Sequence, residues 1–243
     1  MPIRQRADRL LVERGLFESR ARAQAAIAAG RVMANGLPVR KASEPISVAA
    51  AIEATPEHPY VSRGGVKLAA ALDSFALDVS GRVCLDVGAS TGGFTQVLTA
   101  RGARLVYAVD VGRDQLHSSL RGRDEILSIE EVDIRTLNPS RFSERPDFAV
   151  IDVSFISLKL VLPAVTKLLQ ARASLVALIK PQFEAERRHL KKGIVRDPAV
   201  HETVCNEIAA FLAAQKWSVG GVVPSAILGG DGNREFFVEA QRS

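Results

Sequence analysis

The chain has 243 residues, of which 47% are hydrophobic and 24% are charged, and its formal net charge is +5. No segment approaches the roughly 20 consecutive apolar residues of a membrane-spanning helix, and residues 1–9 are too polar for a secretory signal. We therefore expect a cytoplasmic protein without a membrane partner. Cys84, Cys205 and four scattered histidines show no metal-ligand spacing, so no metal site is predicted.

Positive charge is concentrated at the start of the chain. Residues 1–55 hold nine of the 32 basic and five of the 27 acidic residues, which leaves 23 basic against 22 acidic residues in the remainder. A basic module joined to a nearly neutral domain is typical of proteins that bind a polyanion, because Lys and Arg supply phosphate affinity that does not depend on sequence. A solvated basic face is the structural alternative.

Two helices and a hairpin are predicted within this module. A helical pattern runs from Arg6 to Leu16, and a second helix begins at Ser19, a good N-cap, and ends at Gly30. Asn35-Gly36 between two short strand-like runs is a strong local signal for a tight hairpin. The arginines on and around the second helix can converge on one surface suited to phosphate contacts.

The segment ERGLFESRARAQAAIAAGRVMANGLPV, residues 13–39, resembles the S4 domain of ribosomal and RNA-modifying proteins. The resemblance implies docking onto structured RNA through shape and phosphates, with no DNA partner, whereas a generic two-helix extension is the alternative. The residues expected to contact RNA are Arg4, Arg6, Arg20, Arg22, Arg31 and Arg63. We predict an S4-type α+β domain over residues 1–56, a linker over 57–61 and a second domain over 62–243.

Beyond Tyr60 apolar strands alternate with helices, which predicts an α/β domain with a parallel sheet and helices on both faces. The expected strands are Arg82–Val87, Leu105–Asp110, Ile126–Val132, Phe148–Val153 and Leu175–Lys180, and the expected helices include Phe94–Ala100, Ile156–Gln170 and Ala199–Trp217. Two further extended runs, Ser218–Leu228 and Arg234–Ala240, predict a terminal antiparallel hairpin. This seven-stranded, Rossmann-like arrangement is similar to that of class I methyltransferases.

A glycine-rich turn, in the sequence LDVGASTGGF of residues 85–94, joins the first of these strands to its helix. Glycines at such a turn let a ligand approach the backbone closely. Ser90 stands where a dinucleotide fingerprint needs a glycine, and no lysine follows Gly93 as a P-loop requires, so neither phosphate motif fits. Asp110, 22 residues after Gly88, is placed to accept hydrogen bonds from a ribose diol, and Asp133 is placed to meet an adenine.

Together these features predict S-adenosylmethionine as the cofactor. Another nucleotide-type ligand, or a turn that serves only tight packing, remains open. The expected cofactor-binding residues are Asp86, Gly88, Ala89, Ser90, Gly92, Gly93, Phe94, Asp110, Val111, Asp133 and Asp152.

Two charged residues stand at the ends of apolar strands. Asp152 follows FAVI, and Lys180 follows LVALI. Because an unpaired buried charge is costly, we expect the two side chains to face each other. A lysine at such a place can accept a proton, and an adjacent carboxylate fixes its direction. A purely structural ion pair is the alternative.

Five motifs are similar, in order, to those of the TlyA proteins, which belong to the FtsJ-like ribose 2'-O-methyltransferases. They are SRGGVKL at 62–68, GASTGGF at 88–94, DVSFIS at 152–157, IKPQFE at 179–184 and GNREF at 232–236. The similarity spans essentially the whole chain, and it implies that the family's Lys-Asp-Lys-Glu tetrad corresponds to Lys67, Asp152, Lys180 and Glu235.

The resemblance also implies a role for each member. Lys180 would orient and deprotonate a ribose 2'-hydroxyl, and Asp152 would hold Lys180 and lie near the methyl donor. Lys67 and Glu235 would position the nucleotide and tune the lysine. Two alternatives stay open, because Glu239 lies on the same predicted strand face as Glu235 and because Lys67 also fits an exposed helix lysine.

The substrate implied by the resemblance is a cytidine 2'-hydroxyl of ribosomal RNA, in the large subunit and in some members also the small. The partner is then ribosomal RNA or a ribosomal subunit, and the oligomeric state stays open. TlyA proteins are often called haemolysins, but neither a spanning segment nor a long cationic amphipathic helix supports a membrane-active protein here. A non-catalytic RNA-binding or assembly factor is the other alternative, and the intact tetrad disfavours it.

Overall fold

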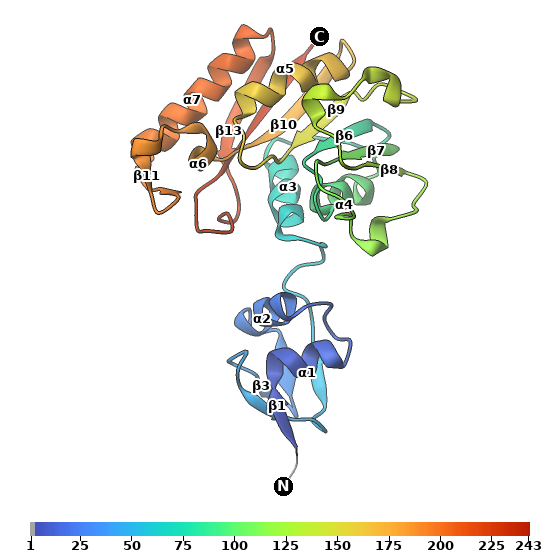
Figure 1. Cartoon of the computed structure of the whole chain (residues 1–243), viewed down its shortest axis with the longest axis vertical. Coiled ribbons are helices and arrows are strands. Elements are labelled where there is room, and N and C mark those ends of the chain that lie inside the picture. Colours follow the sequence, from blue (N-terminus) through green and yellow to red (C-terminus); the bar gives the residue numbers. More distant parts are fainter. Residues whose placement is uncertain (1–2) are drawn as a thin grey trace. The chain divides into compact units, whose positions relative to one another are not determined.

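A computed structural model of the chain describes residues 3–243, and the chain divides into two compact units between Pro59 and Tyr60 (Figure 1). This division falls inside the predicted linker. The first two residues of the domain predicted over 1–56 lie outside the described residues. No helix within residues 3–243 is both long and apolar enough to cross a membrane.

The first unit combines two short helices with two small sheets. Its elements are β1 (Arg4–Arg6), α1 (Ala7–Glu13), α2 (Arg20–Ala28), β2 (Val32–Ala34), β3 (Leu37–Pro38), β4 (Pro45–Ser47) and β5 (Ile52–Ala54). β1 pairs with β4, and β2 lies between β3 and β5. Apolar side chains from both helices, including Leu11 and Ile27, pack with Val32 and Ile46 in one core.

The helix and hairpin predictions for this unit are confirmed. Ser19 caps α2 by accepting a hydrogen bond from the backbone N–H of Arg22. Asn35 and Gly36 have φ of 51° and 74°, as a tight hairpin requires. The first helix is shorter than predicted at both ends, because Arg6 belongs to β1, where it pairs with Pro45, and α1 ends at Glu13. A strand of three residues is too short to carry a readable alternation of polar and apolar side chains.

The second unit is an α/β domain. Its helices are α3 (Arg63–Ser74), α4 (Gly93–Ala100), α5 (Leu158–Leu168), α6 (Pro181–Glu184) and α7 (Pro198–Ala214). Its strands are β6 (Val83–Val87), β7 (Leu105–Val109), β8 (Ile126–Ile129), β9 (Phe148–Ile151), β10 (Ala173–Ile179), β11 (Leu190–Lys191), β12 (Ile194–Val195), β13 (Ser218–Pro224) and β14 (Phe236–Arg242). Short 3₁₀ turns are Ser118–Leu120, Ile134–Thr136, Pro139–Arg141 and Arg187–His189.

Seven of these strands form one sheet in the order β13-β14-β10-β9-β6-β7-β8. The five strands from β8 to β10 are parallel, and β14 runs antiparallel between β10 and β13. One face packs against α5 and α7, and the other packs against α3 and α4 (Figure 1). The predicted doubly wound sheet with a terminal antiparallel hairpin is therefore confirmed.

Several parallel strands end earlier than predicted. β7 ends at Val109, β9 ends at Ile151 and β10 ends at Ile179, so the charged residue that follows each strand begins a loop. Hydrophobic patterning does not separate the last residue of a strand from the first residue of the loop. The difference matters for function, because ligands of open α/β sheets bind in the loops beyond the carboxyl ends of the strands.

Candidate active site

A cleft of about 580 Å³ opens at the carboxyl ends of β6, β7 and β9. The predicted cofactor residues that line it are Gly88, Ser90, Asp110, Val111, Asp133 and Asp152. Gln115, Arg135, Phe155 and Ile156 also line it and were missed by the sequence analysis. The other predicted cofactor residues, Asp86, Ala89, Gly92, Gly93 and Phe94, are buried and are not part of the lining.

The glycine-rich turn is shaped by close backbone approaches. Gly88 has φ of +83°, and a Cβ there would collide with the backbone carbonyl oxygen of Asp152. A Cβ at Gly93 would collide with the hydroxyl of Ser62, just before α3. These glycines let β6, β9 and the start of α3 meet at one edge of the sheet. The turn therefore serves packing as well as access to the cleft.

Asp110 begins the loop after β7, and the loops around it hold its carboxylate in place. One carboxylate oxygen accepts a hydrogen bond from the backbone N–H of Ser90 at 2.8 Å, and the other accepts from the N–H of Gly112 at 2.7 Å. Each oxygen keeps a free lone pair, because a carboxylate has about four acceptor sites. The geometry fits a fixed acceptor for a ribose diol.

Asp133, on the other side of the cleft, is bound to Arg135. The carboxylate accepts a hydrogen bond from the Arg135 backbone N–H at 2.9 Å, and its other oxygen lies 2.5 Å from the guanidinium group. The hydrogen bonds from the Arg135 side chain are the main reason why the pKa of Asp133 is lowered. An adenine that contacts Asp133 would therefore contact the Asp133–Arg135 ion pair.

Asp86 lies behind the cleft, fully buried under α4, where one carboxylate oxygen accepts a hydrogen bond from the Thr95 hydroxyl at 2.6 Å. Its other oxygen has no hydrogen-bond partner. Burial raises the pKa of Asp86 to about 7, and the Thr95 hydroxyl opposes this shift.

We expect the raised pKa to make stability depend on pH. Between about pH 4 and pH 7 the folded protein binds a proton at Asp86 that the unfolded chain has released. The free energy of unfolding therefore falls as the pH rises through this range, by up to roughly 1.4 kcal/mol per pH unit. Asp86→Asn should remove this contribution. Urea unfolding of both proteins at several pH values measures it, and parallel pH profiles would contradict the assignment.

Lys180 and Asp152 lie at the ends of adjacent strands and form an ion pair. The Lys180 Nζ is 2.6 Å from Asp152 Oδ1, and it donates its hydrogen bond to the Ser154 hydroxyl at 2.8 Å. Because no hydrogen bond reaches Asp152 Oδ1, this contact is mainly coulombic. The predicted pairing of the two residues is present, and Asp152 also lines the cleft.

Lys67 and Glu235 form a second, more deeply buried ion pair with a 2.5 Å separation, in which the side chains are 11% and 4% exposed. Lys67 is therefore not an exposed helix lysine. Glu239 shares the strand face of Glu235, as predicted, but it packs against Gly220, and its Oε1 has no hydrogen-bond partner. The geometry thus pairs Lys67 with Glu235 and leaves Glu239 apart.

The two ion pairs belong to the same face and edge of the sheet. Ile179 pairs with Phe236, so Lys180 and Glu235 are the next residues beyond the paired ends of β10 and β14. Side chains alternate along a strand, and Val150, Leu178 and Phe237, each two residues from a charged member, all pack in the core under α3. Asp152, Lys180 and Glu235 continue this face beyond the core, and α3 itself carries Lys67.

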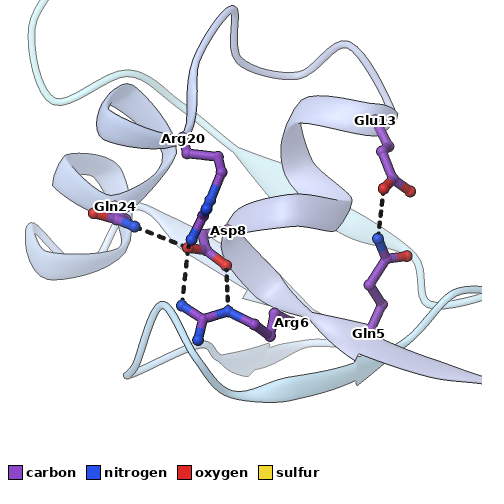
Figure 2. A network of polar contacts seen from close by, with 6 residues as sticks. All are labelled: Gln5, Arg6, Asp8, Glu13, Arg20 and Gln24. Atoms are coloured by element: carbon purple, nitrogen blue, oxygen red, sulfur yellow. Dashed lines mark hydrogen bonds and ion pairs between the residues drawn. The ribbon is translucent and has the colours of Figure 1, made fainter.

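Two arginines of the first unit, Arg6 and Arg20, are organised around Asp8, which is fully buried (Figure 2). Its carboxylate accepts hydrogen bonds from the Arg6 guanidinium at 3.0 and 3.1 Å, from Arg20 at 2.8 and 3.2 Å and from Gln24 at 2.8 Å. These bonds, those from Arg6 above all, hold the pKa of Asp8 well below its usual range. The sequence analysis missed Asp8.

The other arginines predicted to contact RNA have varied surroundings. Arg4 and Arg31 are exposed, and Arg22 lies 3.5 Å from Glu18 in an ion pair along α2. Arg63 belongs to the second unit, where its guanidinium donates to the Leu228 carbonyl oxygen at 2.8 Å. Arg63 therefore helps to hold the loop that leads to Glu235.

Phe155 is the most unusual residue at the rim of the cleft. It has φ of +64° and is 91% exposed, and its ring lies 5.0 Å from that of Phe183. A left-handed backbone at a bulky residue is rare, and it often marks a functional position. The signal in the sequence was an aromatic residue inside the polar run that follows β9.

Comparisons with known proteins agree with this geometry. The FtsJ-like methyltransferase family matches residues 60–242, and the S4 domain family matches residues 5–52. The 16S/23S rRNA (cytidine-2'-O)-methyltransferase TlyA of Mycobacterium tuberculosis is 42% identical over 98% of this chain and 90% of its own length. Hemolysin A of Brachyspira hyodysenteriae is 40% identical over 95% of this chain and 97% of its own length.

Solved structures show the same arrangement of elements. A candidate hemolysin from Streptococcus thermophilus matches with a TM-score of 0.78 and 44% identity, over 100% of this chain and 90% of that one. The two family matches, one over each unit, account for nearly the whole chain. The chain therefore belongs to the FtsJ-like methyltransferase family and joins an S4 domain to its methyltransferase domain.

Proposed function

We propose that this methyltransferase transfers the methyl group of S-adenosylmethionine to a cytidine 2'-hydroxyl of ribosomal RNA, and that it does so in the cytoplasm. The observation that carries the proposal is the Lys180–Asp152 ion pair at the edge of a cleft that suits a nucleoside. The relative named TlyA, with its stated action on cytidine in ribosomal RNA, supports the choice of substrate.

The residues of the cleft fit the cofactor. Asp110 offers two fixed carboxylate oxygens for the ribose, and Gly88 lines the cleft without a side chain. When bound, S-adenosylmethionine supplies a methyl group on a positively charged sulfonium. The Asp152 carboxylate at the cleft lining is suited to face that charge.

The chemistry left to the protein is alignment and proton transfer. In its neutral amine form, Lys180 Nζ accepts the proton of the ribose 2'-hydroxyl and becomes an ammonium group, which Asp152 and Ser154 hold in one direction. Lys67 and Glu235, which neutralise each other, hold the neighbouring strand ends in place around the ribose. Correct alignment of oxygen, methyl carbon and sulfur contributes much of the rate in a transfer of this kind.

Phe155 is suited to bind the base of the target nucleotide. An exposed aromatic ring at the rim of the cleft offers a stacking surface to a base taken out of its helix, and such stacking contributes roughly 1–3 kcal/mol per base. We expect Phe155→Ala to weaken productive RNA binding by about tenfold or more, seen as a higher KM for RNA. The unfolding midpoint should change little, because the ring is exposed, and an unchanged KM for RNA would refute the stacking role.

Asp8 organises the S4 domain for phosphate binding. Arg6 and Arg20 each direct two N–H donors at Asp8 and keep the remaining donors for a phosphate. Asp8→Asn makes the domain more positive, so an electrostatic effect alone would strengthen RNA binding. We predict the opposite, a several-fold loss of RNA affinity, because the two guanidinium groups lose their common anchor. Binding of an rRNA fragment measured by fluorescence anisotropy gives the sign, and circular dichroism checks folding.

The function is tested by incubating the purified protein with methyl-labelled S-adenosylmethionine and either ribosomal RNA or ribosomal subunits from cells that lack this gene. The RNA is then digested to nucleosides, and a parallel reaction uses Lys180→Ala. We expect label in 2'-O-methylcytidine that is absent from the control reaction. Label in another nucleoside would overturn the proposed base, and no label despite S-adenosylmethionine binding would overturn the ribosomal substrate.

Two other functions find less support. A membrane-active haemolysin rests on the names of similar proteins alone, and no helix within residues 3–243 could span a membrane. A non-catalytic RNA-binding factor would have no need for two ion pairs of reactive residues at the edge of an open cleft. A liposome-leakage assay and the methylation assay separate these possibilities from the proposed activity.

A further inference from the structure

One short segment of the methyltransferase domain is strongly positive. Residues 186–196, here called the basic hairpin, include β11 and β12 and contain five Lys or Arg and one Glu. Residues 56–243 hold 23 basic and 22 acidic residues, so the part outside the basic hairpin has 18 basic against 21 acidic. The basic hairpin is thus a positive feature on a domain that is otherwise slightly negative.

Most of this charge is free to meet a ligand. Arg187, Lys191, Lys192 and Arg196 are exposed, and none of them forms an ion pair with any residue of the described range 3–243. The remaining basic residue, Arg188, pairs with Glu186 at 3.1 Å. The turn at Lys192 and Gly193, with φ of 52° and 78°, is a tight one that projects its lysine from the surface.

The basic hairpin is firmly attached beside the catalytic residues. Asn233, which is 2% exposed, accepts a hydrogen bond from the Val195 N–H at 3.1 Å and donates one to the Gly193 carbonyl oxygen at 3.1 Å. His201 also bonds to the Val195 carbonyl oxygen at 2.9 Å. Asn233 stands two residues before Glu235, and Figure 1 shows β11 beside the loop that leads into β14.

The chain path gives the same placement. The basic hairpin starts six residues after Lys180, with only α6 between them, and α6 is tied to the start of α5 because Glu184 accepts a hydrogen bond from the Ser157 hydroxyl at 2.6 Å. One end of the basic hairpin therefore follows Lys180, and its other strand is bonded to the segment that carries Glu235. The basic hairpin is therefore a rigid cationic surface next to a ribose-modifying site, where the neighbouring phosphates of the same RNA would lie.

We propose that the basic hairpin binds the phosphate backbone of the RNA substrate next to the nucleotide that is methylated. This inference rests on the proposed function and adds to it a second RNA-binding surface, carried by the methyltransferase domain itself. Lysines and arginines bind phosphates without reading the bases, so the basic hairpin positions the RNA backbone and thereby determines which nucleotide lies at Lys180. A membrane surface fits less well, because the apolar residues of the hairpin, Leu190 and Ile194, are partly buried.

The test compares two double variants of the full chain. Lys191→Gln with Lys192→Gln removes two charges from the basic hairpin. The matched control, Lys167→Gln with Arg172→Gln, removes two exposed charges, one in the last turn of α5 and one just before β10, at the opposite edge of the sheet. Binding of a ribosomal RNA fragment that contains the methylated site is measured by fluorescence anisotropy between 50 mM and 400 mM KCl, together with S-adenosylmethionine affinity and the unfolding midpoint.

For the hairpin variant we expect RNA affinity at 0.1 M salt to fall by about tenfold or more. The slope of log affinity against log salt concentration should become shallower by about 1 to 2, because each lost phosphate contact removes about one released counterion. The control should keep the wild-type slope, and both variants should keep S-adenosylmethionine affinity. A hairpin variant with the wild-type slope would overturn the proposal even if methylation proceeds normally. A wild-type protein that binds RNA with this slope but methylates nothing would overturn the proposed function alone.

Discussion

Lys180→Ala should lower the rate of methyl transfer at saturating RNA and S-adenosylmethionine by about 10²–10⁴-fold, the usual contribution of a positioned general base. The lysine is the only basic side chain that contacts Asp152 among the described residues, and its Nζ is held by Asp152 and Ser154 in one direction. Its loss removes the proton acceptor and also leaves Asp152 without its counter-charge. S-adenosylmethionine binding should persist, because the cofactor cleft is lined by other residues.

A second variant separates proton transfer from charge. Lys180→Arg keeps a cation that can pair with Asp152, but a guanidinium group stays protonated in proteins and cannot accept the 2'-hydroxyl proton. We expect Lys180→Arg to be nearly as inactive as Lys180→Ala while its RNA and cofactor affinities remain close to those of the wild type. Single-turnover methylation, with RNA and enzyme above their dissociation constant, measures the chemical step. A Lys180→Arg enzyme within about tenfold of wild type would show that Lys180 does not act as a base.

The main features of both domains could be predicted from the sequence because they rest on local chemistry. Asn35-Gly36 and Ser19 determine a turn and a cap within a few residues, and each is present in the structure. The apolar strands of the second domain are continuous because both faces of the sheet are covered, which makes them easy to identify. The pairing of Asp152 with Lys180 followed from the rule that strand ends meet at one edge.

Other features depend on contacts between distant segments, which the sequence does not display. Asp8 appears in the sequence as one acidic residue among arginines, and only the fold brings Arg20 and Gln24 to it. The basic hairpin is visible as a run of charge, but its attachment through Asn233 joins residues about 40 positions apart. The ion pair of Lys67 with Glu235 and not with Glu239 depends on the position of α3, because both glutamates lie on the same strand face.

The ion pair of Lys67 with Glu235 should contribute to both stability and activity. Glu235→Gln leaves Lys67 as a buried charge without a counter-charge, and breaking a buried pair in this way costs about 3–5 kcal/mol. For a domain of this size we expect the unfolding midpoint to fall by roughly 10 °C. We also expect a large loss of methylation, because Glu235 stands next to Lys180 on the neighbouring strand.

Glu239→Gln is the matched control, since it makes the same change four residues away on the same strand face. Glu239 is 5% exposed and has no ion pair with any residue between 3 and 243, so removing its charge leaves no buried cation without a counter-charge. We expect its unfolding midpoint to stay level or rise, with methylation close to wild type. If Glu239→Gln were the inactive variant and Glu235→Gln the active one, the fourth member of the catalytic group would be Glu239.

A double variant then separates the two contributions of the pair. Lys67→Met with Glu235→Leu replaces both charges by apolar side chains of similar size, and such replacements are often neutral or stabilising in a protein interior. We expect the double variant to regain most of the unfolding midpoint lost in Glu235→Gln and to remain inactive. Recovery of stability without activity would mean that the charges act on the RNA and on Lys180. If activity returned together with stability, the pair would serve only to hold α3 against β14.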